Sequence, residues 1–215
     1  MLSLTDIVTA RQVAPTVRAH LAAGKVIAYP TETVYGLGSF ATTEGLDALA
    51  ALKGRPPRKP FLLLVSGFAM LEATGLDLGP SARTLAREFW PGPLTLVLPG
   101  GQGVLPDRLR GPEGGIAVRW TSHRALGALI EAIGQPITST SANRPGGATA
   151  PGVDGIAALF GDAIDDGSLL VLDGGVLGNV PPSTLVDCTQ PLPRIVREGA
   201  IPRRELRRRA GTMAP

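Results

Sequence analysis

The strongest concentration of potential ligand-binding charge lies in segment 52–60, which carries Lys53, Arg55, Arg58 and Lys59. Four cations therefore fall within seven residues. A lysine supplies a compact point charge, whereas an arginine presents a planar fork that matches two phosphate oxygens. This density favours a polyanionic ligand, and a basic loop that is simply solvated is an equally good interpretation of the same residues.

A second group is the run of small polar residues at 138–143, which contains Ser139, Ser141 and Asn143. It follows an apolar stretch with the character of a strand. Hydroxyls and backbone N–H groups in such a loop bind phosphate or carboxylate oxygens. Core packing explains four successive small polar residues poorly, and the alternative is an ordinary Ser/Thr turn.

Two further groups also follow apolar stretches. Segment 29–38 contains Thr31 among threonines and glycines, which suit either a small polar ligand or a turn. Arg119 ends an apolar stretch, and Ser183 and Arg197 follow later in the chain. An arginine in that position is rarely buried without an anion, and a structural salt bridge is an equally common reason for it.

Several familiar chemistries have no support in the sequence. Neither G-x-x-x-x-G-K-[ST] nor G-x-G-x-x-G occurs, and no G-x-S-x-G supports a serine hydrolase. One cysteine, Cys188, excludes an internal disulfide, and only His20 and His123 accompany it as soft ligands. Any metal must then be a hard ion held by oxygens, and we interpret His123 as a cap or packing residue near 121–125.

Apolar runs alternate with helical patterns and predict an α/β domain with a mixed sheet covered by helices. The predicted strands are 26–29, 61–65, 94–98, 116–120, 136–140, 169–172, 184–186 and 195–196. The predicted helices are 13–23, 46–52, 81–89, 125–133 and 153–160, and segment 30–38 is a predicted loop. Gly24 suits the end of the first helix, and Ser81 suits an N-cap.

The composition is that of a globular protein: 215 residues, 44% hydrophobic and 18% charged. No apolar run approaches the roughly 18 residues that span a bilayer, and the N-terminus has no signal-peptide pattern. We therefore expect a cytoplasmic protein without membrane partners.

The net charge of +3 conceals an asymmetry, because residues 194–215 hold seven arginines and two glutamates. The rest of the chain is nearly neutral. Most of these arginines belong to the tail, which either meets phosphates or forms a solvated terminal helix. The tail arginines are Arg203, Arg204, Arg207, Arg208 and Arg209.

Taken in order, these pieces resemble the YrdC/Sua5 family of threonylcarbamoyl-AMP synthases, and the likeness runs from about Val13 to Ile201. Its most specific elements are the pairs Lys53/Arg55 and Ser141/Asn143. The matching blocks are AGKVIAYPTETVYGLG, ALKGRPPRKPFLLLV, FWPGPLTLVLP, GIAVRW, PITSTSAN, STLVDC and RIVREGAI.

The resemblance implies an open, twisted mixed β-sheet flanked by helices, with a concave, positively charged active-site hollow. It implies a catalytic domain over 1–201 followed by an arginine-rich tail over 202–215. The implied reaction converts L-threonine, bicarbonate and ATP, with Mg²⁺, into threonylcarbamoyl-AMP and pyrophosphate for N6-threonylcarbamoyladenosine at tRNA position 37. The implied partners are the downstream transferase complex and tRNA.

The resemblance also assigns roles. Lys53 and Arg55 correspond to the phosphate-side cations, Ser141 and Asn143 to triphosphate or Mg²⁺ contacts, and Arg197 to the nucleotide side. The corresponding threonine contacts are Thr31, Lys59, Arg119, Ser139 and Ser183, with Arg119 suited to the carboxylate. Val34 or Leu63 is expected beside the threonine methyl group, and many relatives carry His or Asn in place of Lys59.

Two alternative functions belong to other classes. One is a double-stranded RNA- or tRNA-binding module of the same fold without adenylate-forming activity, although the body carries slightly more acids than bases. The other is carbamoyl-adenylate chemistry in hydrogenase maturation, whose proteins are longer and carry further zinc-binding and acylphosphatase-like regions.

Overall fold

The computed structural model describes residues 1–54, 60–178, 180–210 and 213–214. Within them, ten strands form one sheet in the order β1-β8-β2-β3-β7-β4-β6-β5-β9-β10. The strands are β1 (Leu2–Ser3), β2 (Val26–Tyr29), β3 (Gly36–Gly38), β4 (Leu62–Val65), β5 (Leu94–Leu98), β6 (Ile116–Trp120), β7 (Ile137–Ser141), β8 (Leu169–Asp173), β9 (Thr184–Asp187) and β10 (Arg194–Arg197). Parallel pairs such as β4–β6 and antiparallel pairs such as β4–β7 both occur. The predicted mixed sheet is confirmed.

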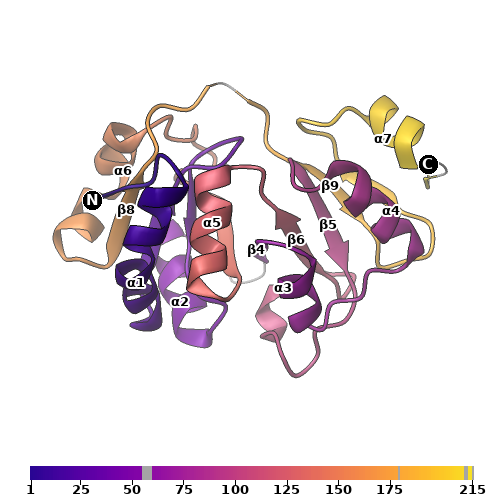
Figure 1. Ribbon diagram of the computed structural model, residues 1–215, viewed down its shortest axis with the longest axis horizontal. Helices are drawn as coiled ribbons and strands as arrows, with labels where there is room; N and C mark the ends of the chain where they lie inside the picture. The colour runs from indigo at the N-terminus through magenta and orange to yellow at the C-terminus, as the bar shows by residue number, and fades with distance from the viewer. Residues whose placement is uncertain (55–59, 179, 211–212, 215) are drawn as a thin grey trace.

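The helices pack on both faces of this sheet (Figure 1). They are α1 (Ile7–Ala22), α2 (Thr43–Lys53), α3 (Phe68–Ala73), α4 (Pro80–Phe89), α5 (Arg124–Ile133), α6 (Val153–Asp165) and α7 (Arg203–Ala210), with a 3-10 turn at Asp107–Leu109. Helices α1 and α5 lie side by side and share one core with Ile27 and Tyr29 of β2. The alternate residues of β2, Val26 and Ala28, belong to the other core. Strand alternation therefore divides the interior into two layers.

Helix α1 begins six residues earlier than the predicted start at position 13. Asp6 forms a capping box with Thr9, in which the Asp6 carboxylate accepts from the Thr9 N–H at 2.8 Å. A start at Val13 would have placed Pro15 in the first turn, where proline is tolerated, but the helix contains Pro15 in its interior. The Asp6 cap decides the boundary.

The prediction of a loop over 30–38 is wrong at its end, where β3 pairs antiparallel with both β2 and β7. Glycines hide this strand from propensity arguments because they are poor strand formers. They are required by close packing: a Cβ at Gly38 would lie 2.0 Å from the Thr138 carbonyl oxygen, and one at Gly36 would lie 3.0 Å from the Tyr29 ring.

The predicted N-cap role of Ser81 is also wrong. Gly79 occupies the N-cap of α4 and Pro80 its first turn, where the missing N–H costs nothing. The Ser81 hydroxyl instead donates to the Pro191 carbonyl at 3.0 Å. Helix α3 has no counterpart in the sequence prediction, because six residues are too few to show a periodic pattern.

The last helix packs against α4, and Leu206 is fully buried between them and the core. The expected terminal helix is therefore present, and it is docked on the body. Among the residues that the structure describes, no helix combines the length and apolar character that a bilayer crossing requires. Cys188 is a free thiol.

Candidate functional site

A hollow of about 630 Å³ opens where β3, β7 and β4 meet β6, β5, β9 and β10 in the sheet. It collects the predicted site residues that the structure describes, from six separate places in the sequence. Those residues are Thr31, Lys53, Arg119, Ser139, Ser141, Asn143, Ser183 and Arg197. Arg55 and Lys59 lie outside the described residues.

One side of the hollow, which we call the lysine wall, consists of Lys53, Ser141 and Asn143. Lys53 is the last residue of α2, and Gly54 caps the helix in the left-handed region at φ 59°. The buried ammonium donates to the Ser141 carbonyl at 2.5 Å and to the carbonyl and side-chain oxygens of Asn143. The Ser141 hydroxyl donates to Asn143 Oδ1 at 2.7 Å. This wall is assembled by its own hydrogen bonds.

Arg144 ties the lysine wall to two helices, a role that no sequence pattern indicated. Its guanidinium donates to the carbonyl oxygens of Leu52 in α2 at 3.2 Å and Leu159 in α6 at 2.8 Å. It also lies 4.8 Å from the centre of the Phe160 ring. The loop that carries Asn143 is thereby fixed relative to Lys53.

The opposite side, which we call the arginine wall, consists of Arg119, Ser183 and Arg197. Arg119 is only 4% exposed, and its Nε lies 3.7 Å from Oε1 of Glu32. Neither of these two buried atoms has a hydrogen-bond partner among the described residues. The other Glu32 oxygen accepts from the Thr121 hydroxyl at 2.5 Å. A buried cation with so little compensation is costly unless an anion joins it.

Arg197 adds a second guanidinium to this wall and donates to the Ser183 carbonyl at 2.9 Å. Burial lowers the pKa of Arg197 below its ordinary value, and the nearby positive charge of Arg119 lowers it further. The Ser183 hydroxyl lies 2.8 Å from the Thr95 hydroxyl. The wall thus holds two mutually repelling cations, an arrangement that an anionic ligand stabilises.

Thr31 lines the hollow, but its hydroxyl serves the local turn. It donates to the Val34 carbonyl at 2.7 Å and accepts from the N–H groups of Thr33 and Val34. Val34 lines the hollow as expected, whereas Leu63 is fully buried in the core and does not. Leu62 takes that place, because successive strand residues point to opposite faces.

The rim contains charged residues that the sequence analysis did not single out. Arg194 lies 3.3 Å from Asp187 and 3.6 Å from Glu113. Burial raises the pKa of Asp187, but hydrogen bonds from Thr189 and Arg194 outweigh it, and the pKa lies below its ordinary value. The described lining therefore carries both charge signs, with cations at Lys53, Arg119, Arg194 and Arg197 and acids at Glu113 and Asp187.

In an open mixed sheet, a hollow at the ends of the central strands is a common place for a ligand, and this hollow is lined by cations, acids and hydroxyls. The family model Sua5_yciO_yrdC, described as "Telomere recombination", matches residues 19–199. The chain belongs to this family, and the expected fold is confirmed.

Curated relatives carry the name threonylcarbamoyl-AMP synthase. The protein from Pyrococcus abyssi is 36% identical over 189 residues, which cover 87% of this chain and 54% of the relative. The protein from Marinobacter nauticus is 36% identical over 171 residues, covering 79% of this chain and 88% of the relative. The chain thus spans about half the length of the first relative and most of the second.

Solved structures have the same fold. Pyrococcus abyssi Sua5 in complex with L-threonine is 33% identical, with a TM-score of 0.83 over 97% of this chain and 59% of that one. Escherichia coli YciO is 28% identical, with a TM-score of 0.75 over 88% of this chain and 90% of that one.

Proposed function

We propose that this chain is a threonylcarbamoyl-AMP synthase, a nucleotidyltransferase that forms threonylcarbamoyl-AMP and pyrophosphate from L-threonine, bicarbonate and ATP. The names of its curated relatives and the threonine complex of one structural relative support this activity. The observation within the chain that carries the proposal is Arg119, a buried cation in a hollow whose Nε has no hydrogen-bond partner among the described residues.

The reaction requires two bond-forming steps. The threonine amine attacks the bicarbonate carbon, and loss of water leaves a carbamate. A carbamate oxygen then attacks the α-phosphorus of ATP, the bond from the α-phosphorus to the bridging oxygen breaks, and pyrophosphate leaves with that oxygen. Because the threonine carboxylate, bicarbonate and the ATP triphosphate meet in one site, the site must hold these anionic groups together and offset their mutual repulsion.

The arginine wall suits the amino acid. A carboxylate beside Arg119 would bind the guanidinium whose Nε has no hydrogen-bond partner among the described residues and lies 3.7 Å from Glu32. Ser139 and Ser183 line the hollow, and their hydroxyls are proposed to bind the substrate hydroxyl. The Thr31 hydroxyl is already engaged in its own turn. Lys59 remains part of the proposed threonine contacts through the resemblance alone.

The lysine wall suits the phosphates. Lys53 offers a positive charge, and Ser141 and Asn143 offer neutral polar groups within one hydrogen-bonded cluster. Arg55 is proposed beside them from its position in the sequence, and Arg197 is proposed on the nucleotide side.

The donor set fits Mg²⁺ carried by ATP. Among the described residues no group of three or more His, Cys, Asp or Glu side chains is arranged to hold a metal. Ser141 Oγ and Asn143 Oδ1, 2.7 Å apart, are hard oxygen donors of the kind that complete a phosphate-bound magnesium shell. Bound in this way, Mg²⁺ would neutralise phosphate charge.

The proposed product is an activated carbamoyl group, so the next reaction is its transfer to an acceptor amine. We assign that step to the downstream transferase complex that modifies adenosine at tRNA position 37, in the cytoplasm.

The experiment is incubation of the purified chain with ATP, labelled bicarbonate and single amino acids. We expect pyrophosphate and an AMP-linked label with threonine, and neither when threonine or bicarbonate is omitted. Pyrophosphate release that does not depend on threonine would contradict the proposal.

A further inference from the structure

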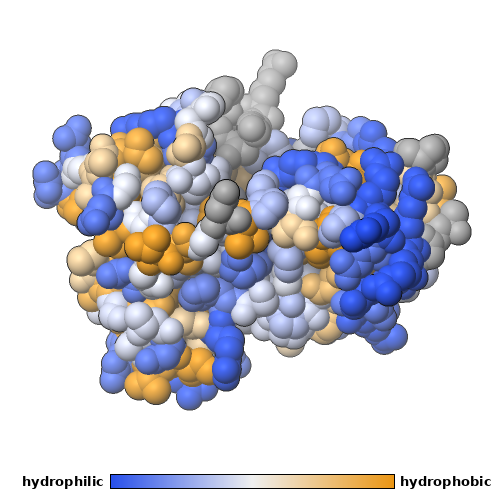
Figure 2. Space-filling model, turned by 90° about the horizontal axis from the view of Figure 1, so that it is seen from above, coloured by the Kyte–Doolittle hydropathy of each residue, from blue (hydrophilic) through white to orange (hydrophobic). Residues whose placement is uncertain are grey.

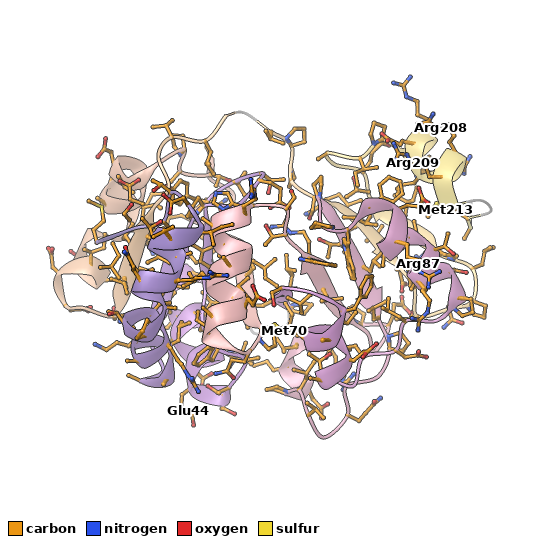
Figure 3. The ribbon with its side chains drawn as sticks, viewed as in Figure 1. Glu44, Met70, Arg87, Arg208, Arg209 and Met213 are labelled. Atoms are coloured by element: carbon orange, nitrogen blue, oxygen red, sulfur yellow. The ribbon has the colours of Figure 1, made fainter. Side chains whose placement is uncertain are left out.

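Four arginines of α7 form one exposed face, which we call the α7 surface: Arg203, Arg204, Arg207 and Arg208. At 3.6 residues per turn they occupy a continuous arc on the side of the helix away from Leu206, which is fully buried. Figure 2 shows strongly hydrophilic residues gathered over this end of the molecule. Figure 3 places Arg208 of α7 and Arg87 of α4, which is also exposed, at this same end.

The fifth arginine of the helix has a different environment. Arg209 forms an ion pair with Glu205 at 3.2 Å and lies 5.6 Å from the centre of the Phe89 ring. Its charge is thus used within the fold. No member of the α7 surface forms an ion pair among the described residues, in contrast with Arg108, Arg110 and Arg194 elsewhere.

The fold holds these four charges in place. Ile201, before the helix, accepts a hydrogen bond from the Thr184 hydroxyl at 2.7 Å, and its N–H donates to the same oxygen at 3.0 Å. After the helix, Met213 is buried in the core and the Ala214 N–H donates to the Pro193 carbonyl at 2.8 Å. The helix is therefore anchored on both sides of its arginines.

This arrangement has an electrostatic cost that a ligand can reverse. Arg203 and Arg207, and likewise Arg204 and Arg208, are like charges four residues apart, a spacing at which side chains repel on a helix. A polyanion along this face turns the repulsion into attraction.

We propose that the α7 surface docks the phosphodiester backbone of RNA. Guanidinium forks match phosphate oxygens, and backbone contacts of this kind need no particular base sequence. A membrane surface fits poorly, because an interfacial helix inserts an apolar face and the apolar face of α7 is buried in the protein. The choice of RNA over other polyanions rests on the proposed role in tRNA modification.

The position of α7 connects this surface to the hollow. Strand β10 carries Arg197 of the arginine wall, and only residues 198–202 separate it from α7. RNA docked on the α7 surface would therefore lie on the β10 side of the hollow.

The test compares two charge-matched double variants. Arg207→Gln with Arg208→Gln removes two charges from the α7 surface, and Arg11→Gln with Arg18→Gln removes two exposed charges from α1. Glutamine and arginine have similar helix propensities, so we expect both variants to melt like the wild type. The probe is a labelled tRNA transcript titrated at several salt concentrations.

We expect the α7 variant to bind the transcript about tenfold or more weakly at low salt, with the slope of log K against log salt smaller by about 1.4 to 1.8. The α1 variant should match the wild type. Arg207→Lys with Arg208→Lys keeps the charges and should keep the slope, which separates phosphate binding from an effect on folding.

Three results would overturn the proposal: no transcript binding by the wild type, equal losses in the α7 and α1 variants, or competition by polyglutamate or anionic vesicles as strong as that by RNA. Threonine-dependent pyrophosphate release, measured on the same samples, distinguishes the two proposals. Absence of RNA binding by the wild type with full pyrophosphate release rejects only the docking surface, and RNA binding by the wild type without release rejects only the synthase activity.

Discussion

The two walls of the hollow each contain a buried basic side chain, but the two side chains differ in their hydrogen bonding. On the lysine wall, the Lys53 ammonium donates to three oxygens of Ser141 and Asn143. On the arginine wall, Arg119 Nε lies 3.7 Å from Glu32 and has no hydrogen-bond partner among the described residues. Both cations are more than nine-tenths buried, so burial does not account for the difference.

The lysine wall is therefore preorganised by its own hydrogen bonds, whereas the arginine wall is stabilised when an anionic ligand binds. A cation with its hydrogen bonds complete fixes the shape of its wall, and a ligand there gains from geometry that already exists. A buried cation with incomplete hydrogen bonds stores an unfavourable desolvation energy, which an anion relieves on binding. We therefore expect ligand affinity to depend most on Arg119 and the rate of phosphoryl chemistry most on Lys53.

The largest expected effect is on threonine affinity. Arg119→Ala should weaken threonine binding by about 10²- to 10³-fold, since loss of a buried charged partner costs about 2–5 kcal/mol or more, and should change ATP binding far less. Calorimetry with each ligand measures both.

The control for this variant is Arg119→Ala combined with Glu32→Gln. The single variant leaves the Glu32 carboxylate buried without its cation, which lowers stability whatever the role of Arg119. The double variant should regain thermal stability without regaining threonine affinity. Equal losses for threonine and ATP would make Arg119 a purely structural residue.

The next effect is on rate. Lys53→Ala should lower the rate of pyrophosphate formation by about 10²-fold or more, because it removes the positive charge that is proposed to stabilise the negative charge developing on the phosphates. Lys25→Ala is the matched control, since Lys25 also donates to a backbone carbonyl, that of Gly167 at 2.8 Å, and does not line the hollow. A folded Lys53→Ala variant with the wild-type rate would remove phosphate binding from this wall.

Substrate choice tests the hydroxyls and apolar groups between the walls. Threonine should be preferred over serine by about 1–3 kcal/mol, the usual worth of one methyl group, and valine should be rejected more strongly because buried hydroxyl partners would be left unpaired. Val34→Ala should narrow the gap between threonine and serine in a competition assay. A valine rate equal to that of serine would show that the hydroxyl is not recognised.

The smallest effect concerns the support of the arginine wall. The His123 ring caps α5 by accepting from the Leu126 N–H. The backbone N–H of His123 donates to the Thr121 hydroxyl, which in turn donates to Glu32. Burial lowers the pKa of His123, so the unfolded chain binds the proton more tightly than the folded one. This contribution to stability is complete above the ordinary pKa of about 6.5 and is lost as the pH falls below it.

The measurement is the free energy of unfolding at pH 7 and pH 5. His123→Asn keeps a capping acceptor that does not titrate, and it should lose less stability than the wild type over this interval. Burial also lowers the pKa of His20, but that residue is present in both proteins and cancels in the comparison. If the free energy of unfolding depended on pH identically in the variant and the wild type, His123 would not contribute to the pH dependence of stability.

Much of the fold was predictable because central strands such as β2, β4 and β5 are buried on both faces. Strands such as β5 and β6 are short apolar runs, and their predicted bounds are confirmed. The predictions were wrong where close packing or a helix cap, rather than the apolar pattern, determines the structure. β3 exists because close packing demands glycine, and α1 begins where Asp6 can cap it.

The candidate site divides in the same way. Residues at the ends of apolar runs were identifiable, since strand ends commonly present ligand groups, and the described ones do line a single hollow. Their roles there remain predictions. The partners of these residues were not identifiable: Glu32 lies far from Arg119 in the sequence, and Arg144 reaches carbonyl groups on two helices.

By itself, the sequence determined where most of the strands lie, because the apolar character of each strand is a local property, and it supplied the cations and hydroxyls at the strand ends. Only the tertiary structure decided which buried cation would find hydrogen-bond acceptors within the fold and which would not. Lys53 and Arg119 are both buried basic side chains, but the first lies among three oxygen acceptors and the second beside one distant carboxylate. Electrostatic energy depends on such distances between segments remote in the chain, and no local pattern encodes them.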